Sequence, residues 1–99
     1  MDVNERIRAE LASAPVVLFM KGTPEMPQCG FSAQTAGALR TLGARFHHVN
    51  IFDDPEMREA LKRMSNWPTY PQLYVKGELV GGCDIALQMY QSGELKTLL

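Results

Sequence analysis

Apolar residues gather along the chain in short runs that predict strands. Residues 15–20 read Pro-Val-Val-Leu-Phe-Met, an apolar run without polar residues at alternate positions. A strand that is buried on both faces of a sheet has this pattern, so we predict a central strand here. Two shorter runs flank Lys76-Gly77, which is a hairpin signal. The other predicted strands are residues 46–51, 73–75 and 78–80.

Helices are predicted where apolar positions recur at helical spacing and where suitable end residues flank them. Gly43 is typical of the C-terminal end of a helix, here one over residues 31–42. Asp53-Asp54-Pro55-Glu56 combines an acidic N-cap with proline in the first turn, which predicts a helix running to about residue 64. The remaining predicted helices are residues 4–11, 84–90 and 92–99.

The predicted elements follow one another in the order α-β-α-β-α-β-β-α-α. We expect the first strand–helix–strand unit to be parallel, with a right-handed crossover, and the closing hairpin to be antiparallel. This order predicts an α/β fold with a mixed four-stranded sheet and helices on both faces. Because 99 residues suit one domain, we assign residues 1–99 to a single domain.

Charge and hydropathy argue against two classes of partner. The chain has 10 basic and 11 acidic residues, whereas nucleic-acid binding usually shows as a basic surplus. Its longest apolar run is far shorter than the about 20 residues that cross a bilayer. We therefore expect neither nucleic-acid nor membrane binding. The first residues are acidic and polar, without the apolar segment of a signal peptide, so we expect a cytoplasmic, reducing location.

Cys29 is the strongest candidate for chemistry. The preceding residues 21–28 contain Gly22, Pro24 and Pro27, which predict a loop that delivers Cys29 to a helix N-terminus. Free backbone N–H groups and the helix dipole favour negative charge there, so the thiol should ionise readily. Lys21 could add positive charge nearby. The alternative interpretation is a packed, inert cysteine.

Ser32 stands three residues after Cys29, on the same side of the first helical turn. A cysteine at this position could close an intramolecular disulfide, which a serine cannot. The thiolate of Cys29 therefore needs an external thiol, or serves another task. The other cysteine, Cys83, is 54 residues away, and we interpret it as a small buried residue.

Three further features could form a binding site. The segment Trp67-Pro-Thr-Tyr-Pro-Gln makes the Tyr70–Pro71 bond a candidate for cis, in a turn that exposes backbone groups, or else it is an ordinary proline-rich loop. Gly81-Gly-Cys-Asp84 opens a helix whose N–H groups could hold a carboxylate, or Asp84 simply caps that helix. The guanidinium of Arg58 suits a carboxylate, although a solvated arginine is the default.

Four motifs in register resemble the monothiol glutaredoxins of the Cys-Gly-Phe-Ser class. They are Lys21-Gly-Thr-Pro, Cys29-Gly-Phe-Ser, Trp67-Pro-Thr-Tyr-Pro-Gln and Gly81-Gly-Cys-Asp. The resemblance covers essentially the whole chain and implies a thioredoxin-like (glutaredoxin) fold. One departure is Tyr70, where phenylalanine is common in the family.

The resemblance implies a glutathione site. Lys21 and Arg58 would hold the glycine carboxylate of glutathione. The backbone of Tyr70 would pair with its cysteinyl unit. Cys83 and Asp84 would hold its γ-glutamyl end.

The resemblance also implies a task. Cys29 would be the active thiolate and an iron ligand. A [2Fe–2S] cluster takes four thiolates, which two protomers and two glutathiones could supply as a cluster-bridged homodimer. BolA-like proteins and iron–sulfur acceptor proteins are the implied partners. The alternatives are a glutathione-dependent oxidoreductase that uses one cysteine, and an adaptor for which cluster binding is incidental.

Overall fold

The computed structural model describes residues 2–99, and within them the elements follow the predicted order. The strands are β1 (Val16–Met20), β2 (His47–Asn50), β3 (Gln72–Val75) and β4 (Glu78–Gly81). The helices are α1 (Val3–Ala12), α2 (Gly30–Thr41), α3 (Pro55–Ser65), α4 (Cys83–Ser92) and α5 (Glu94–Leu98).

The strands form one mixed sheet in the order β2-β1-β3-β4. β1 and β2 are parallel, while β3 pairs antiparallel with both β1 and β4. The predicted parallel unit and closing hairpin are thus confirmed. Gly81 extends the predicted strand by one residue, because it pairs with Leu73 as the last residue of β4. Its φ is 150°, and an added Cβ would lie 2.7 Å from the side chain of Ile85, so glycine is required where the chain turns into α4.

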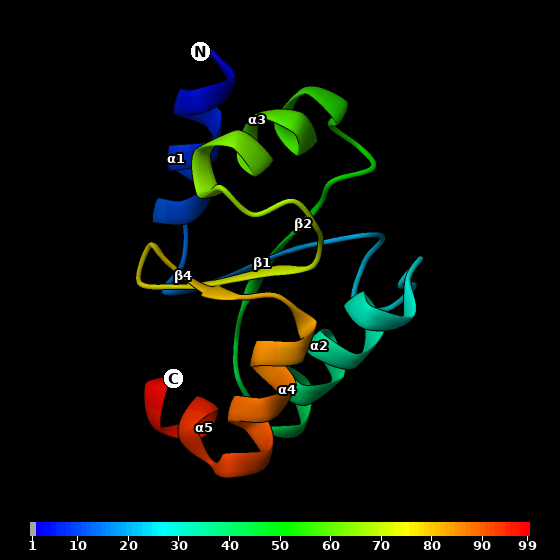
Figure 1. The fold of residues 1–99 in the computed structure, drawn as a ribbon, viewed down its shortest axis with the longest axis vertical. Coiled ribbons are helices and arrows are strands. Elements are labelled where there is room, and N and C mark those ends of the chain that lie inside the picture. Colours follow the sequence, from blue (N-terminus) through cyan, green and yellow to red (C-terminus); the bar gives the residue numbers. More distant parts are fainter. Residues whose placement is uncertain (1) are drawn as a thin grey trace.

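Helices cover both faces of the sheet, as predicted (Figure 1). α1 and α3 pack on one face, and α2, α4 and α5 pack on the other. All five residues of β1 are buried, which confirms the expected central strand. Val17 and Phe19 contribute to the cluster under α1 and α3, while Val16, Leu18 and Met20 contribute to the opposite cluster. Burying each large side chain stabilises the fold by about 1.5–3 kcal/mol, so this strand holds the two layers together.

Local capping fixes the helix ends as the sequence predicts. Asp54 is the N-cap of α3, and its carboxylate accepts a hydrogen bond from the backbone N–H of Met57 at 3.1 Å. Gly43 adopts a φ of 69° just after α2, the left-handed conformation that glycine tolerates best. No helix among residues 2–99 has both the length and the apolar character needed to span a membrane.

Candidate functional site

The loop over residues 21–28 is closed on itself by backbone hydrogen bonds. The N–H of Gln28 donates to the carbonyl of Lys21 at 2.9 Å, and Gly22 forms an isolated bridge with Pro27. Gly22 has a φ of 89°, and a Cβ there would lie 2.5 Å from the carbonyl oxygen of Met26. Only glycine fits this position, because any side chain would meet backbone that cannot move independently. The loop therefore presents Cys29 from a defined position.

Asn50 anchors this loop to the end of β2. Its side-chain oxygen accepts hydrogen bonds from the N–H of Gly22 at 2.9 Å and from the N–H of Phe52 at 3.1 Å. One amide oxygen thus joins the loop before Cys29 to the loop before α3. This link exists because β1 and β2 are parallel, so that the chain leaves both strands at the same edge of the sheet.

Cys29 is the N-cap residue of α2, with extended backbone and a partly exposed side chain. The backbone N–H of Ser32 lowers the pKa of its thiol most, and the N–H of Phe31 and the positive charge of Lys21 lower it further. Partial burial acts in the opposite direction. The thiol is partly exposed and not packed in the core, which argues against the alternative interpretation of Cys29, and its reactivity stays a prediction. The helix N-terminus stabilises its thiolate.

Ser32 is completely buried and has a second role besides replacing a thiol. Its hydroxyl oxygen accepts a hydrogen bond from the backbone N–H of Lys21 at 3.1 Å. This bond ties the first turn of α2 to the end of β1, on either side of Cys29. The serine therefore orders the thiolate site as well as excluding a disulfide within the turn.

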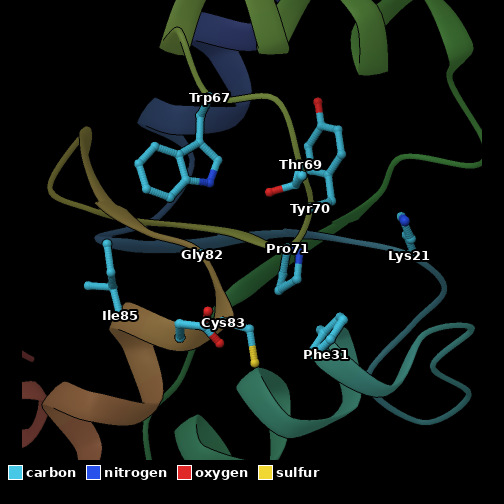
Figure 2. A pocket seen from close by; sticks show the side chains of 10 residues that line it. Lys21, Phe31, Trp67, Thr69, Tyr70, Pro71, Gly82, Cys83 and Ile85 are labelled. Atoms are coloured by element: carbon cyan, nitrogen blue, oxygen red, sulfur yellow. The ribbon is translucent and has the colours of Figure 1, made fainter.

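A groove with a volume of about 320 Å³ opens beside this site (Figure 2). Its walls come from the end of β1, the start of α2, the segment before β3 and the start of α4. The lining residues are Lys21, Phe31, Trp67, Thr69, Tyr70, Pro71, Gly82, Cys83, Asp84 and Ile85. The fold thus brings four of the predicted binding residues together: Lys21, Tyr70, Cys83 and Asp84.

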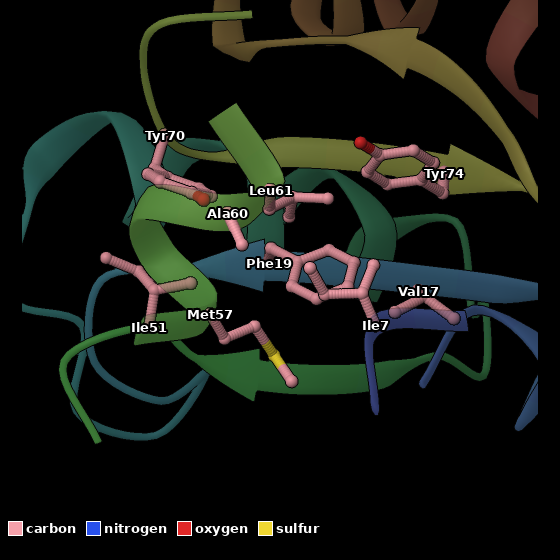
Figure 3. Packing of buried hydrophobic residues seen from close by; sticks show 9 residues of the cluster. All are labelled: Ile7, Val17, Phe19, Ile51, Met57, Ala60, Leu61, Tyr70 and Tyr74. Carbon is pink, nitrogen blue, oxygen red and sulfur yellow. The ribbon is translucent and has the colours of Figure 1, made fainter. Parts of the chain in front are cut away.

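The Tyr70–Pro71 peptide bond is cis, as predicted. Tyr70 is buried, and its side chain joins the hydrophobic cluster under α3 (Figure 3). Its hydroxyl donates to the backbone carbonyl of Arg58 at 2.7 Å, and burial raises the pKa of the phenol. The phenol therefore stays neutral and packs in the core. Because the side chain of Tyr70 packs into the cluster under α3, replacing phenylalanine by tyrosine leaves the backbone of residue 70 free to form the groove wall.

The start of α4 forms the opposite wall. Gly82, not Asp84, is the N-cap residue of α4, so the interpretation of Asp84 as the helix cap is wrong. Asp84 is exposed in the first turn and lines the groove. Cys83 is buried, as expected, and its thiol donates to the side-chain oxygen of Gln34 in α2 at 3.5 Å. This wall offers the groove a carboxylate beside a helix N-terminus.

Two predicted site residues do not line the groove: Cys29, which stands two residues before the lining residue Phe31, and Arg58. The guanidinium of Arg58 lies over the ring of Phe52, 5.5 Å from the centroid, and its Nε has no hydrogen-bond partner among the described residues. The contact is a cation–π interaction at a partly exposed position. Phe52 stands only six residues before Arg58, but residue types alone do not show that the chain enters α3 with the ring under the guanidinium.

Sequence reasoning also missed groove residues. Trp67 and Thr69 belong to a segment that the sequence singled out, but neither was named as a lining residue. Phe31 is 60% exposed although it is aromatic, which an apolar position in a helix does not reveal. The sequence feature that could have identified Phe31 is its position two residues after Cys29, since a ring exposed there borders the site.

Comparisons with known proteins agree with this geometry. The family model described as Glutaredoxin matches residues 16–80. The chain is 54% identical over 97 residues to monothiol glutaredoxin-S11 of Oryza sativa subsp. japonica, covering 98% of this chain but only 20% of that protein. It is 53% identical over 95 residues to glutaredoxin 4 of Escherichia coli K12, covering 96% of this chain and 83% of that one.

Solved structures show the same fold. The reduced poplar apo GrxS14 is 47% identical, with a TM-score of 0.83 over 96% of this chain and 87% of that one. A buckwheat glutaredoxin–glutathione complex superposes with a TM-score of 0.87 over 98% of this chain and 86% of that one, at 23% identity, which shows a shared fold. A thiolate at the start of α2 beside a cis-proline groove, the matched family and these relatives lead to one conclusion: the chain is a monothiol member of the glutaredoxin family.

Proposed function

We propose that this chain binds glutathione in the groove beside Cys29 and carries a [2Fe–2S] cluster for transfer to other proteins. One observation carries the proposal: Cys29 is a partly exposed cysteine with a lowered pKa, and Ser32 stands where a resolving thiol would be. A thiolate that cannot form a disulfide within its own turn remains available as a metal ligand.

Glutathione fits the charges around the groove. The ammonium group of Lys21 would hold the glycine carboxylate, and the backbone of Tyr70 would pair with the cysteinyl unit. The γ-glutamyl end carries a carboxylate and an ammonium group. The N–H groups at the start of α4, at Cys83, would hold its carboxylate, and the carboxylate of Asp84 would hold its ammonium group. Arg58 would reach a carboxylate by leaving the ring of Phe52. The buckwheat complex shows that this fold is compatible with glutathione.

The thiolate count supports a shared cluster. A [2Fe–2S] cluster in its all-sulfur form needs four thiolates. Among residues 2–99, no three His, Cys, Asp or Glu side chains gather into a metal site, and Cys83 is buried. Each protomer would therefore supply Cys29 and one bound glutathione, and two protomers would complete the ligand set. Because half of the ligands are exchangeable small molecules, the cluster would be easily released as cargo.

The resemblance to monothiol glutaredoxins suggests the partners. The homodimer would be bridged by the cluster, and a BolA-like protein could replace one protomer. Iron–sulfur acceptor proteins would receive the cluster in the cytoplasm. Neither nucleic acid nor a membrane is required.

Anaerobic reconstitution with iron, sulfide and glutathione tests the proposal. The wild-type protein should give a coloured dimer with the visible absorption of a [2Fe–2S] cluster, and omission of glutathione should prevent it. Cys29→Ser should lose the cluster, while Cys83→Ser, which removes the buried thiol but keeps the backbone at the start of α4 that would hold glutathione, should keep it. Equal cluster content in Cys29→Ser and wild type would refute the assignment.

A second candidate function uses the same lowered pKa of Cys29. The Cys29 thiolate would attack the glutathione sulfur of a protein mixed disulfide, forming a Cys29–glutathione disulfide and releasing the protein thiolate. A second glutathione thiolate would then attack that disulfide, giving oxidised glutathione and free Cys29. Rapid turnover of a glutathionylated substrate by the cluster-free protein would favour this role over cluster transfer.

A further inference from the structure

Gln72 is a polar side chain sealed inside the fold. Its relative exposure is 0%, although it is the first residue of β3 and directly follows the cis-proline. Its amide nitrogen donates to the carbonyls of Trp67 at 3.1 Å and Thr69 at 3.3 Å. Its amide oxygen accepts from the hydroxyl of Tyr74 at 2.8 Å. Both N–H donors of this side chain are thus directed at the segment before β3, and its oxygen accepts from Tyr74.

The direction of these bonds matters. Trp67 and Thr69 both line the groove, and the segment over residues 67–71, here called the groove turn, forms one of its walls (Figure 2). The two amide hydrogens of Gln72 bind two carbonyls of the groove turn from the core, on the side away from the groove. Tyr74, which packs edge-to-face against Phe19 at 5.5 Å between centroids, donates its hydroxyl to the oxygen of the amide from the core.

Burying an amide side chain costs free energy unless its donors and acceptor are all needed for hydrogen bonds. An apolar residue of similar size would fill the same space without a desolvation cost, but it would leave two carbonyls of the groove turn unpaired. No aliphatic or hydroxyl side chain can donate twice and accept once in this geometry. Two donors are needed here because the groove turn presents two carbonyls. A core that only had to be well packed would not need them.

We propose that Gln72 is a positioning residue that fixes the groove turn, and through it the backbone on which a peptide-like thiol docks. The inference rests on the proposed glutathione site and adds a residue that acts on it from the core. Gln72 does not line the groove, so its effect passes through the carbonyls of Trp67 and Thr69.

Three variants separate positioning from general stability. Gln72→Met keeps an unbranched side chain of similar size and removes every hydrogen bond. Gln72→Glu keeps the acceptor for Tyr74 but, when ionised, removes both donors to the groove turn. Tyr74→Phe is the matched control, because it removes only the bond to the amide oxygen and leaves the two bonds to the groove turn in place.

Two readouts are recorded for each variant, beside its melting temperature. Trp67 is the only tryptophan of the chain, so its fluorescence and its indole NMR signal report on the groove turn without any ligand. Titration with reduced glutathione gives the dissociation constant. Both Gln72 variants should shift the Trp67 signals and weaken glutathione binding on the order of five- to tenfold. Tyr74→Phe should melt earlier than wild type but keep the wild-type Trp67 signals and glutathione affinity.

The outcomes distinguish the two proposals. Unchanged Trp67 signals and glutathione affinity in Gln72→Met would overturn the inference while leaving the proposed function intact. Equal changes in Tyr74→Phe and Gln72→Met would also overturn it, because they would show a general loss of packing. A wild-type protein that binds no glutathione would overturn the proposed function, and the Trp67 signals alone would then decide whether Gln72 holds the groove turn.

Discussion

Two walls of the groove are held in place by different means. On the side of Cys29, here called the thiolate wall, the loop over residues 21–28 is closed mainly by its own backbone, and backbone N–H groups of α2 lower the pKa of Cys29. On the side of the segment before β3, the groove turn is held by the buried amide of Gln72. The thiolate wall thus depends mostly on groups that every residue carries, with Asn50 and Ser32 as added side-chain acceptors, whereas the groove turn depends on one side chain.

This difference teaches where each wall is vulnerable. Backbone hydrogen bonds tolerate many side chains, so the thiolate wall should fail only where a residue type is required by sterics or by a lone acceptor. Gly22, Ser32 and Asn50 are those positions. The groove turn should fail at Gln72 and leave the thiolate unaffected.

The largest effect is expected from Gly22→Ala. A Cβ at φ 89° costs roughly 1–3 kcal/mol in strain, and its approach to 2.5 Å from the carbonyl of Met26 adds to that cost. Thermal melting should therefore drop by about 4–8 °C for each kcal/mol. Gly37→Ala in α2 is the control, because a Cβ there meets nothing within 4 Å. A melting temperature for Gly22→Ala equal to that of Gly37→Ala would contradict a rigid loop.

Ser32→Ala should have the next largest effect. It leaves the N–H of Lys21 without its acceptor, which costs about 1–3 kcal/mol for a group shielded from water. Chemical denaturation measures this loss. Thr35→Val removes a buried hydroxyl from the same helix, but that hydroxyl only donates to the carbonyl of Phe31, so no donor is orphaned. Equal losses in the two variants would show that the bond from Lys21 to Ser32 has no special weight.

The smallest effect concerns charge. Lys21→Met should raise the pKa of Cys29 slightly. The charge of Lys21 lowers this pKa less than the backbone N–H groups do, and water and salt screen it. The thiolate absorbance of wild type should include a transition below the pH at which an ordinary cysteine ionises, and Cys29→Ser should lack that transition. Gln72→Met should leave the pKa of Cys29 at its wild-type value. A shift there would show that the two walls are coupled.

The same pKa predicts how stability varies with pH. Because folding lowers the pKa of Cys29, the unfolded chain binds more protons between the folded and unfolded values. The free energy of unfolding should therefore gain from Cys29 as pH rises through that window, in full above the unfolded value. It should lose this contribution as pH falls through the folded value. Cys29→Ser should lack the effect in the same denaturation series.

Much of the fold could be predicted because its signals are local. The uninterrupted apolar run of β1 predicts burial on both faces, and the acidic residues before Pro55 predict the N-cap that Asp54 provides. The Cys29 environment was also predictable, since a loop followed by a helix start already places N–H groups around the thiol. These inferences need only a few consecutive residues and elementary geometry.

The rest depends on the three-dimensional arrangement of the chain. The exposure of Phe31, the stacking of Arg58 on Phe52 and the capping of α4 by Gly82 all differ from a reading of the sequence alone. Phe52 and Gly82 are close in sequence to the residues they affect, but residue type does not give the backbone path that brings the groups together. Arg58 shows this most clearly, because its residue type suits a carboxylate while its surroundings hold it against an aromatic ring.

The sequence by itself determined the elements, their order and the ionisable sulfur at the start of α2, because hydrogen-bond capacity, backbone freedom and helical spacing are properties of neighbouring residues. Only the tertiary structure decided which of the candidate residues share one groove. It also decided that a glutamine would be sealed beneath that groove, because burial and pairing depend on which segments of the sheet and helices meet.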